Sequence, residues 1–212
     1  MHWRRWMWIA AAVIIVAGFA AWGPIVSQVD EPPYHVERVE QPFELRVYAP
    51  MLVAEVRVKG ERDEAINQGF RLLADYIFGN NTSAAKLAMT APVTQQEAST
   101  KIPMTAPVLQ QQEGDNVWQV RFVMPANYKK ISELPQPNNP EVQLLHMPER
   151  RFAVIRFSGS SAPSNLDEHR QLLAEYVTNK GLKPIGEPVL AFYNPPWTLP
   201  FLRRNEVLQE IK

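Results

Sequence analysis

Few side chains in this sequence are suited to hold a metal ion, and those few are imidazoles and thioethers. Of the four histidines, His146, at the end of an expected strand, is the best single candidate for an imidazole ligand. A lone histidine is more often a partly exposed structural residue, so both interpretations stay open. Met89 and Met104 carry thioether sulfurs that can ligate iron or can pack softly where an irregular strand begins. Cysteine is absent, which excludes disulfides, thiolate metal sites and a cysteine nucleophile.

Signatures of catalysis are missing from the sequence. It contains no GxSxG elbow, HExxH helix, phosphate-binding loop or GxGxxG turn, so we nominate no catalytic residue and expect a protein that is not an enzyme. Glu44 and Glu55 are carboxylates that a hydrolase-like reaction could use, but strand alternation does not say whether either points inward. Near the C-terminus, Arg203 could meet a carboxylate ligand in two-point fashion, and Tyr193 belongs to the same closing segment.

The charge balance argues against a polyanionic partner. The chain has 212 residues with 22 basic and 22 acidic side chains. Beyond the first 26 residues, its basic doublets are Lys129-Lys130, Arg150-Arg151 and Arg203-Arg204. These doublets are too short to follow a phosphate backbone, so nucleic acid is not an expected partner.

The N-terminal segment predicts a membrane anchor. Residues 6–26 contain no charge, and a helix of these 21 residues, at about 1.5 Å per residue, spans a hydrocarbon core about 30 Å thick. Arg4 and Arg5 precede this run, which predicts that the rest of the chain lies across the membrane. The alternative is a signal peptide, cleaved near Gly18-Phe19-Ala20 or left uncleaved. We therefore expect an anchor over residues 1–26, a polar linker over 27–41 and one domain over 42–212.

An internal repeat organises this domain. The segment RLLADYI (71–77) recurs as QLLAEYV (171–177), and the apolar run at 51–60 resembles the run at 150–159. Each copy is typical of a strand, a turn at glycine and a helix. In the first helix, Ile66, Phe70, Leu73 and Ile77 form one stripe that we expect to face a sheet. Two such units are expected to close around a common core.

A shorter repeated motif indicates a family. The motif KxxMTAPV occurs at 86–93 and again at 101–108, after a helix of the form GFxxLxxYIxGxN (69–81). With FELRxYxP (43–50) and YNPPxxxxxxRRNEV (193–207), the chain resembles the SOUL haem-binding family from about residue 39 to its end.

The resemblance implies an α+β fold, a distorted antiparallel β-barrel of two pseudo-symmetric units with two main helices packed outside. It also implies that haem or another tetrapyrrole binds in an apolar cleft beside the first helix. The candidate binding residues are Ile66, Phe70, Leu73, Met89, Met104, His146, Tyr193 and Arg203. Some relatives carry a histidine ligand where this chain has Val47, and basic residues where it has Asn67 and Asp75.

Three functional hypotheses follow. The first is a haem- or tetrapyrrole-binding protein for haem handling or buffering, held by a single span in a bacterial inner membrane with its domain in the periplasm. Its partners would be a small apolar ligand and the membrane. The second is a protein-interaction domain with a vestigial cleft, which would use edge strands or the proline-rich loop at 134–140 to meet an unknown partner. The third is a hydrolase-like use of the same barrel.

Overall fold

The computed structural model of the protein describes residues 30–83 and 99–212. The expected anchor at 1–26 and the first MTAPV copy with Met89 lie outside these residues. Within them, neither α-helix is long and apolar enough to cross a bilayer.

Two long helices and a series of strands make up the described chain. The helices are α2 (Arg62–Phe78) and α3 (Pro163–Asn179), and two 3-10 turns, η1 (Ile131–Glu133) and η2 (Pro200–Leu202), lie in connections. The strands are β1 (Tyr34–Glu40), β2 (Phe43–Tyr48), β3 (Met51–Lys59), β4 (Asn81–Thr82), β5 (Val108–Gln112), β6 (Val117–Val123), β7 (Gln136–Pro137), β8 (Gln143–Met147), β9 (Arg150–Phe157), β10 (Pro184–Phe192) and β11 (Asn205–Ile211). The α+β class is thus confirmed.

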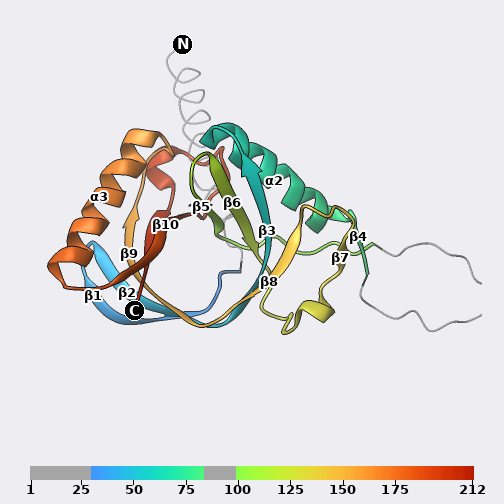
Figure 1. Cartoon of the computed structure of the whole chain (residues 1–212), viewed down its shortest axis with the longest axis horizontal. Helices are drawn as coiled ribbons and strands as arrows, with labels where there is room; N and C mark the ends of the chain where they lie inside the picture. Colours follow the sequence, from blue (N-terminus) through green and yellow to red (C-terminus); the bar gives the residue numbers. More distant parts are fainter. Residues whose placement is uncertain (1–29, 84–98) are drawn as a thin grey trace, which may run out of the picture.

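Nine strands form one antiparallel sheet in the order β1-β2-β9-β11-β10-β5-β6-β3-β8. The order is symmetric about the β5–β10 pair, with β6, β3 and β8 on one side and β11, β9 and β2 on the other. The first strand of each repeat unit pairs with a strand of the other unit: β2 pairs with β9, and β8 pairs with β3. Figure 1 shows the sheet curling between the two helices, α2 outside β3 and β6 and α3 outside β9. The two pseudo-symmetric units are therefore interlocked.

Two details differ from the expected barrel and linker. Strands β1 and β8 are edges, so the sheet is a curled half-barrel and not a closed barrel. Residues 34–40 of the expected linker form β1, which pairs with β2 along its length. The curled sheet therefore begins inside the segment that composition alone marks as a spacer.

The helices cover separate apolar clusters on one face of the sheet. Strand alternation sends Ala153 and Ile155 toward α3, and the intervening Val154 toward the opposite, inner face. On α2, Leu73 and Ile77 are buried as expected, but Phe70 is 38% exposed. The reason is that the helix is closest to the sheet at Gly69, one position away from Phe70.

Gly69 allows α2 to lie directly on the sheet. A Cβ at this position would be 2.6 Å from Val120 Cγ2, closer than such atoms approach in folded proteins, and 3.2 Å from Val56 Cγ2, which is a tight contact. The branched side chains of β3 and β6 fill the space that another residue on the helix would occupy. This contact sets the distance between α2 and the sheet.

Ionic groups fill part of the inner face. The fully buried Glu206 carboxylate accepts hydrogen bonds from Arg46 at 2.8 and 3.1 Å, from Tyr193 at 2.7 Å and from Arg204 at 3.0 Å. Arg46 also donates to the Tyr48 hydroxyl at 3.1 Å. Glu206 raises the pKa of Arg46 against the opposing effect of burial. The network holds β2 and β11 together across the intervening β9.

Gly69→Ala should lower the free energy of unfolding by about 1–3 kcal/mol, the usual effect of an extra methyl group in a packed contact. Urea unfolding followed by circular dichroism measures this change. The control is Gln68→Ala, which introduces alanine at the neighbouring exposed position. Its free energy of unfolding should stay within about 0.5 kcal/mol of the parent value. Equal stability of the two variants would contradict the close approach of α2.

Glu206→Gln should cost about 3–5 kcal/mol of unfolding free energy, because it leaves the Arg46 guanidinium buried without its counter-charge. Glu210→Gln is the matched control on the same strand. Its partner Arg150 is partly exposed, so the loss there should be below about 1 kcal/mol. Similar losses for both variants would show that the Glu206 network does not behave as a buried ion cluster.

Stability should also fall at high pH. Burial raises the pKa of Tyr48 to about 12 from an ordinary value of 10.0. The folded chain keeps this phenol proton while the unfolded chain releases it, so the contribution is complete below pH 10 and is lost as pH rises to about 12. Tyr48→Phe should flatten this decline by up to about 3 kcal/mol in urea unfolding between pH 9 and 12. An unchanged slope would contradict the raised pKa.

Candidate functional site

A groove of about 450 Å3 lies between the N-terminal half of α2 and the chain that follows β10. Its volume is within the range of small-molecule sites, about 300–1,000 Å3. Residues of both repeat units line it: Arg62, Asp63, Ile66, Asn67, Phe70, Val108, Gln110, Ser161, Phe192, Asn194 and Pro196. Val108 and Phe192 are register partners in the β5–β10 pair, so the floor of the groove is the junction between the units.

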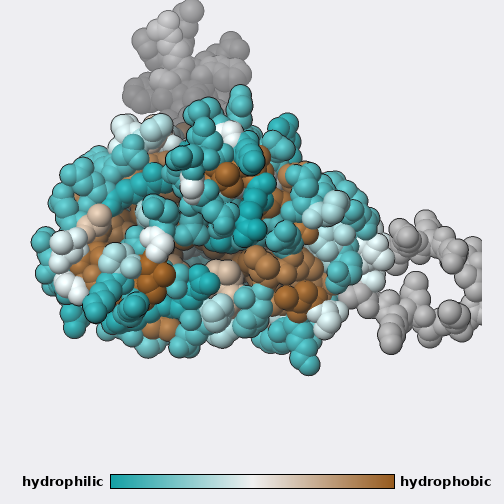
Figure 2. Space-filling view, viewed as in Figure 1, coloured by the Kyte–Doolittle hydropathy of each residue, from teal (hydrophilic) through white to brown (hydrophobic). Residues whose placement is uncertain are grey.

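The walls are largely apolar. Ile66 and Phe70 come from α2 and face Phe192 and Pro196 across the groove. The ring of Phe70 packs edge-on against Phe122, with centroids 5.2 Å apart, so it is supported on one side and exposed on the other. Figure 2 shows apolar surface beside α2 within a mostly hydrophilic face. A flat apolar molecule could therefore lie against these rings.

Arg62 is the cation that lines this groove. Its Nη2 donates to Gln110 Oε1 at 2.7 Å, and its Nη1 lies 3.2 Å from Asp63 Oδ1. The guanidinium carbon is 5.8 Å from the ring centroids of both Trp118 and Phe192. Burial lowers the pKa of Arg62, but a guanidinium remains charged at neutral pH.

The bonding of Arg62 is incomplete. Its Nε is buried and has no hydrogen-bond partner among the described residues. The paired carboxylate, Asp63, is 85% exposed and so is a weak counter-ion. Because Asp63 is a weak counter-ion, a ligand carboxylate in the groove could pair with the Arg62 guanidinium.

The predicted binding residues separate into several places. Ile66 and Phe70 line the groove together. Leu73 is fully buried in the α2 core, and Met104 is partly buried against the same core. Arg203 donates to the carbonyls of Thr198 and Pro196, at 2.7 and 2.5 Å, and so shapes the loop that borders the groove.

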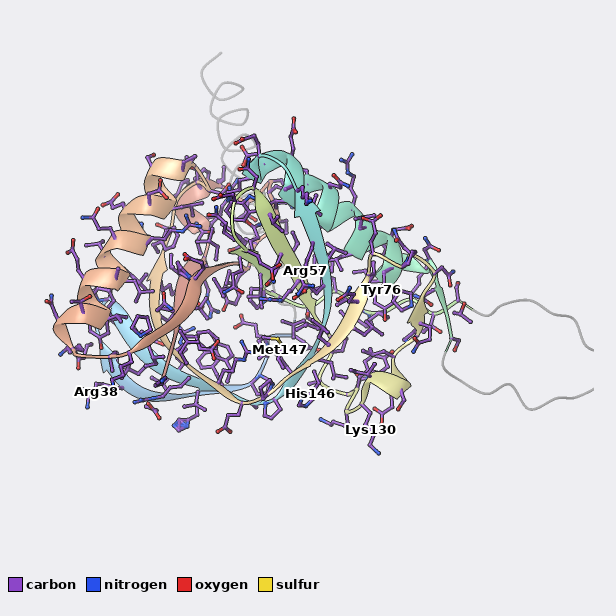
Figure 3. The ribbon with its side chains drawn as sticks, viewed as in Figure 1. Arg38, Arg57, Tyr76, Lys130, His146 and Met147 are labelled. Carbon is purple, nitrogen blue, oxygen red and sulfur yellow. The ribbon has the colours of Figure 1, made fainter. Side chains whose placement is uncertain are left out.

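His146 lies elsewhere. It is exposed on β8 and borders a different pocket, of about 310 Å3, with Lys129 and Tyr128. Figure 3 shows it far from the part of α2 that forms the groove. The structure therefore does not bring the candidate imidazole to the candidate tetrapyrrole site.

The inner-face carboxylates and the proline-rich loop are engaged within the fold. Glu55 is buried and lies 2.6 Å from Arg121 Nε, and Glu44 accepts from Arg46 Nε at 2.7 Å. Tyr193 is tied to Glu206, and burial raises its pKa well above the usual value. Leu134 is fully buried, and β7 in the 134–140 loop pairs with β4.

Arg62 and Phe192 are groove residues that the sequence interpretation missed. Arg62 opens α2 directly after Gly60-Glu61, where a basic residue usually means only a solvated helix start. The position of Phe192 one residue before the YNPP motif was the available signal, since neighbouring strand residues point to opposite faces. The pairing of β5 with β10, which brings the two groups together, has no local signature.

The groove fits some features of a tetrapyrrole. Its rings and aliphatic groups match an apolar macrocycle, and Arg62 matches a propionate. Within the part of the chain that the structure describes, the groove lining contains no histidine, methionine, cysteine or tyrosine that could ligate iron. The arrangement can therefore bind the macrocycle and its acid groups, and it leaves iron coordination to groups outside this lining.

Solved structures share the fold. The C-terminal domain of EcmrR is similar with a TM-score of 0.57 at 11% identity, covering 84% of this chain and 98% of that one. A hydrolase from Listeria innocua is similar with a TM-score of 0.53 at 11% identity, covering 83% and 94%. At these identities the likeness concerns the arrangement of strands and helices alone.

Sequence comparison identifies the family. Heme-binding protein 2 of Mus musculus is 27% identical over 172 residues, which cover 78% of this chain and 76% of that protein. The sequence model for the SOUL heme-binding proteins matches residues 29–210, nearly the whole described chain. The repeated unit, the α2 groove and this match agree, and the chain belongs to the SOUL heme-binding protein family.

Proposed function

We propose that this protein binds haem or a related tetrapyrrole in the groove beside α2. The observation that carries the proposal is the combination, in one groove, of apolar and aromatic walls with an incompletely paired, partly buried arginine. Membership of a heme-binding family supports the same ligand class. No catalytic role is proposed, because the inner-face carboxylates Glu44, Glu55 and Glu206 all have arginine partners.

Each wall of the groove would have its own role. Phe70 and Phe192 would hold the face of the macrocycle, and Ile66 would exclude water beneath it. Arg62 would orient the ligand by donating to a propionate. When bound, haem would supply an iron centre and a strong visible absorption, and the described residues act by binding and orienting it.

We further propose that the protein works at a membrane. The support is the uncharged run at 6–26 with Arg4 and Arg5 before it, which has the length and flanking charges of a single span. A domain held in this way on the outer side of a bacterial inner membrane would keep its ligand local. Haem handling or buffering in the cell envelope is the role that agrees with both the proposed ligand and the proposed anchoring.

Titration of the purified full-length protein with haemin tests the ligand. A shifted Soret band that saturates near one haemin per chain is expected. A response that grows without saturation, or no response, would contradict the proposal. Phe70→Ala should weaken binding through loss of ring contact, whereas Phe78→Ala, an exposed phenylalanine at the other end of α2, should leave it unchanged.

Arg62→Gln should weaken haemin binding about tenfold or more, the usual value of a hydrogen bond to a charged group. The same variant should bind haemin dimethyl ester as the parent does, because the ester has no propionate charge to lose. Arg71→Gln is the control, an exposed arginine on the same helix. Equal losses for acid and ester would show that Arg62 supports the fold and does not bind a carboxylate.

A further inference from the structure

The loop between β10 and β11 presents large apolar side chains to solvent. Trp197 is 71% exposed, Phe201 is 70% exposed, and Leu199 and Leu202 are exposed to a lesser degree. Single exposed hydrophobic residues are ordinary, but four within six positions form a patch. We call this set, Trp197, Leu199, Phe201 and Leu202, the apolar loop.

Internal hydrogen bonds keep the backbone of the apolar loop in one shape. Arg203 spans it by donating to the carbonyls of Pro196 and Thr198. The Leu202 amide donates to Leu199 O at 2.9 Å, and the Gly159 amide donates to Pro200 O at 2.9 Å. The apolar side chains are thus held outward on a braced turn, although collapse onto the domain would hide them from water.

The end of the apolar loop lies beside the place where the chain enters the domain. Arg204, which follows the loop, binds both oxygens of Glu31 at 2.9 and 3.0 Å. The Ala106 amide donates to Asp30 O at 3.0 Å, which fixes the residue before Glu31. The first described residues and the base of the loop are therefore adjacent.

The number of residues between the uncharged run and Asp30 limits the distance between this end of the domain and a bilayer. The uncharged run ends at residue 26, four residues before Asp30, and four residues reach at most about 14 Å. Arg203 adds a positive charge, since no carboxylate lies within salt-bridge distance of it in residues 30–83 and 99–212. A cation and exposed tryptophan near a span are typical of groups that lie at lipid headgroups.

We infer that the apolar loop inserts into the headgroup region of the bilayer that holds the anchor. This inference rests on the anchoring part of the proposed function. Asn194 and Pro196, at the start of the loop, also line the α2 groove, so insertion places the groove mouth at the lipid surface. An apolar tetrapyrrole would then pass between the bilayer and the groove without crossing water.

The absence of cysteine allows a direct test in the full chain. Phe201→Cys carries an environment-sensitive fluorophore, and the protein is reconstituted in vesicles of phosphatidylcholine and phosphatidylglycerol with or without spin-labelled lipid. The control is Phe78→Cys, also exposed, at the end of α2, which is about 24 Å from the start of the helix. We expect a blue-shifted emission quenched by the spin-labelled lipid at 201, and neither effect at 78.

The possible outcomes separate the claims. Absence of quenching at 201, or equal quenching at both positions, overturns membrane insertion of the loop. A blue shift at 201 that needs haemin and not lipid also overturns it, because the loop would then cover the ligand. Haemin titration of the same labelled protein in detergent reports on the groove alone, so insertion without haemin binding contradicts only the proposed ligand. Mass spectrometry of the reconstituted chain shows whether the leader is retained, and a cleaved leader overturns the inference.

Discussion

Antiparallel pairing between β5 and β10 joins the two repeated units, and without it neither the single sheet nor the groove would exist. Each unit could bury its own helix against its own strands, because the two clusters under α2 and α3 are separate. At the junction, however, Val108 and Phe192 meet from different units and form a surface that neither has alone. The candidate site is thus a property of the assembled repeat and not of one supersecondary element.

The two faces of the sheet are stabilised by different means. Under the helices the contacts are apolar, and the approach of α2 at Gly69 leaves no room for another side chain. On the inner face, charged groups are paired with one another, as around Glu206. Such a network contributes most when every member is present, because removing one member leaves the others buried without partners. The groove lies outside this network, where a ligand need not disturb it.

The local sequence pattern was enough to predict the helices, the main strands, the duplication and the family. Glycine turns and apolar periodicity depend only on residues that are close together in the sequence. It also placed Ile66 and Phe70 beside one another. It could not predict the exchange of β2 and β8 or the open edges, which depend on pairing between distant segments. The same limit applies to the site: Arg62 and Phe192 are 130 residues apart in sequence, and the exposure of Phe70 follows from the packing of its neighbour Gly69. His146 was the best imidazole candidate from its place at a strand end, yet the sheet places it at a pocket other than the α2 groove.

The exchange of first strands has a consequence for the history of the fold. A lone unit would lack one strand of its sheet, and a second identical copy could supply it, as in a twofold homodimer. Fusion of two copies into one chain removes the requirement that both be identical. The halves have indeed diverged: the positions of Arg62 and Phe70 correspond, at the 100-residue offset of the helices, to Ala162 and Arg170. The first half has a cation and an aromatic ring at these two helix positions, whereas the second half has an alanine and an arginine, so a pseudo-symmetric scaffold carries an asymmetric site.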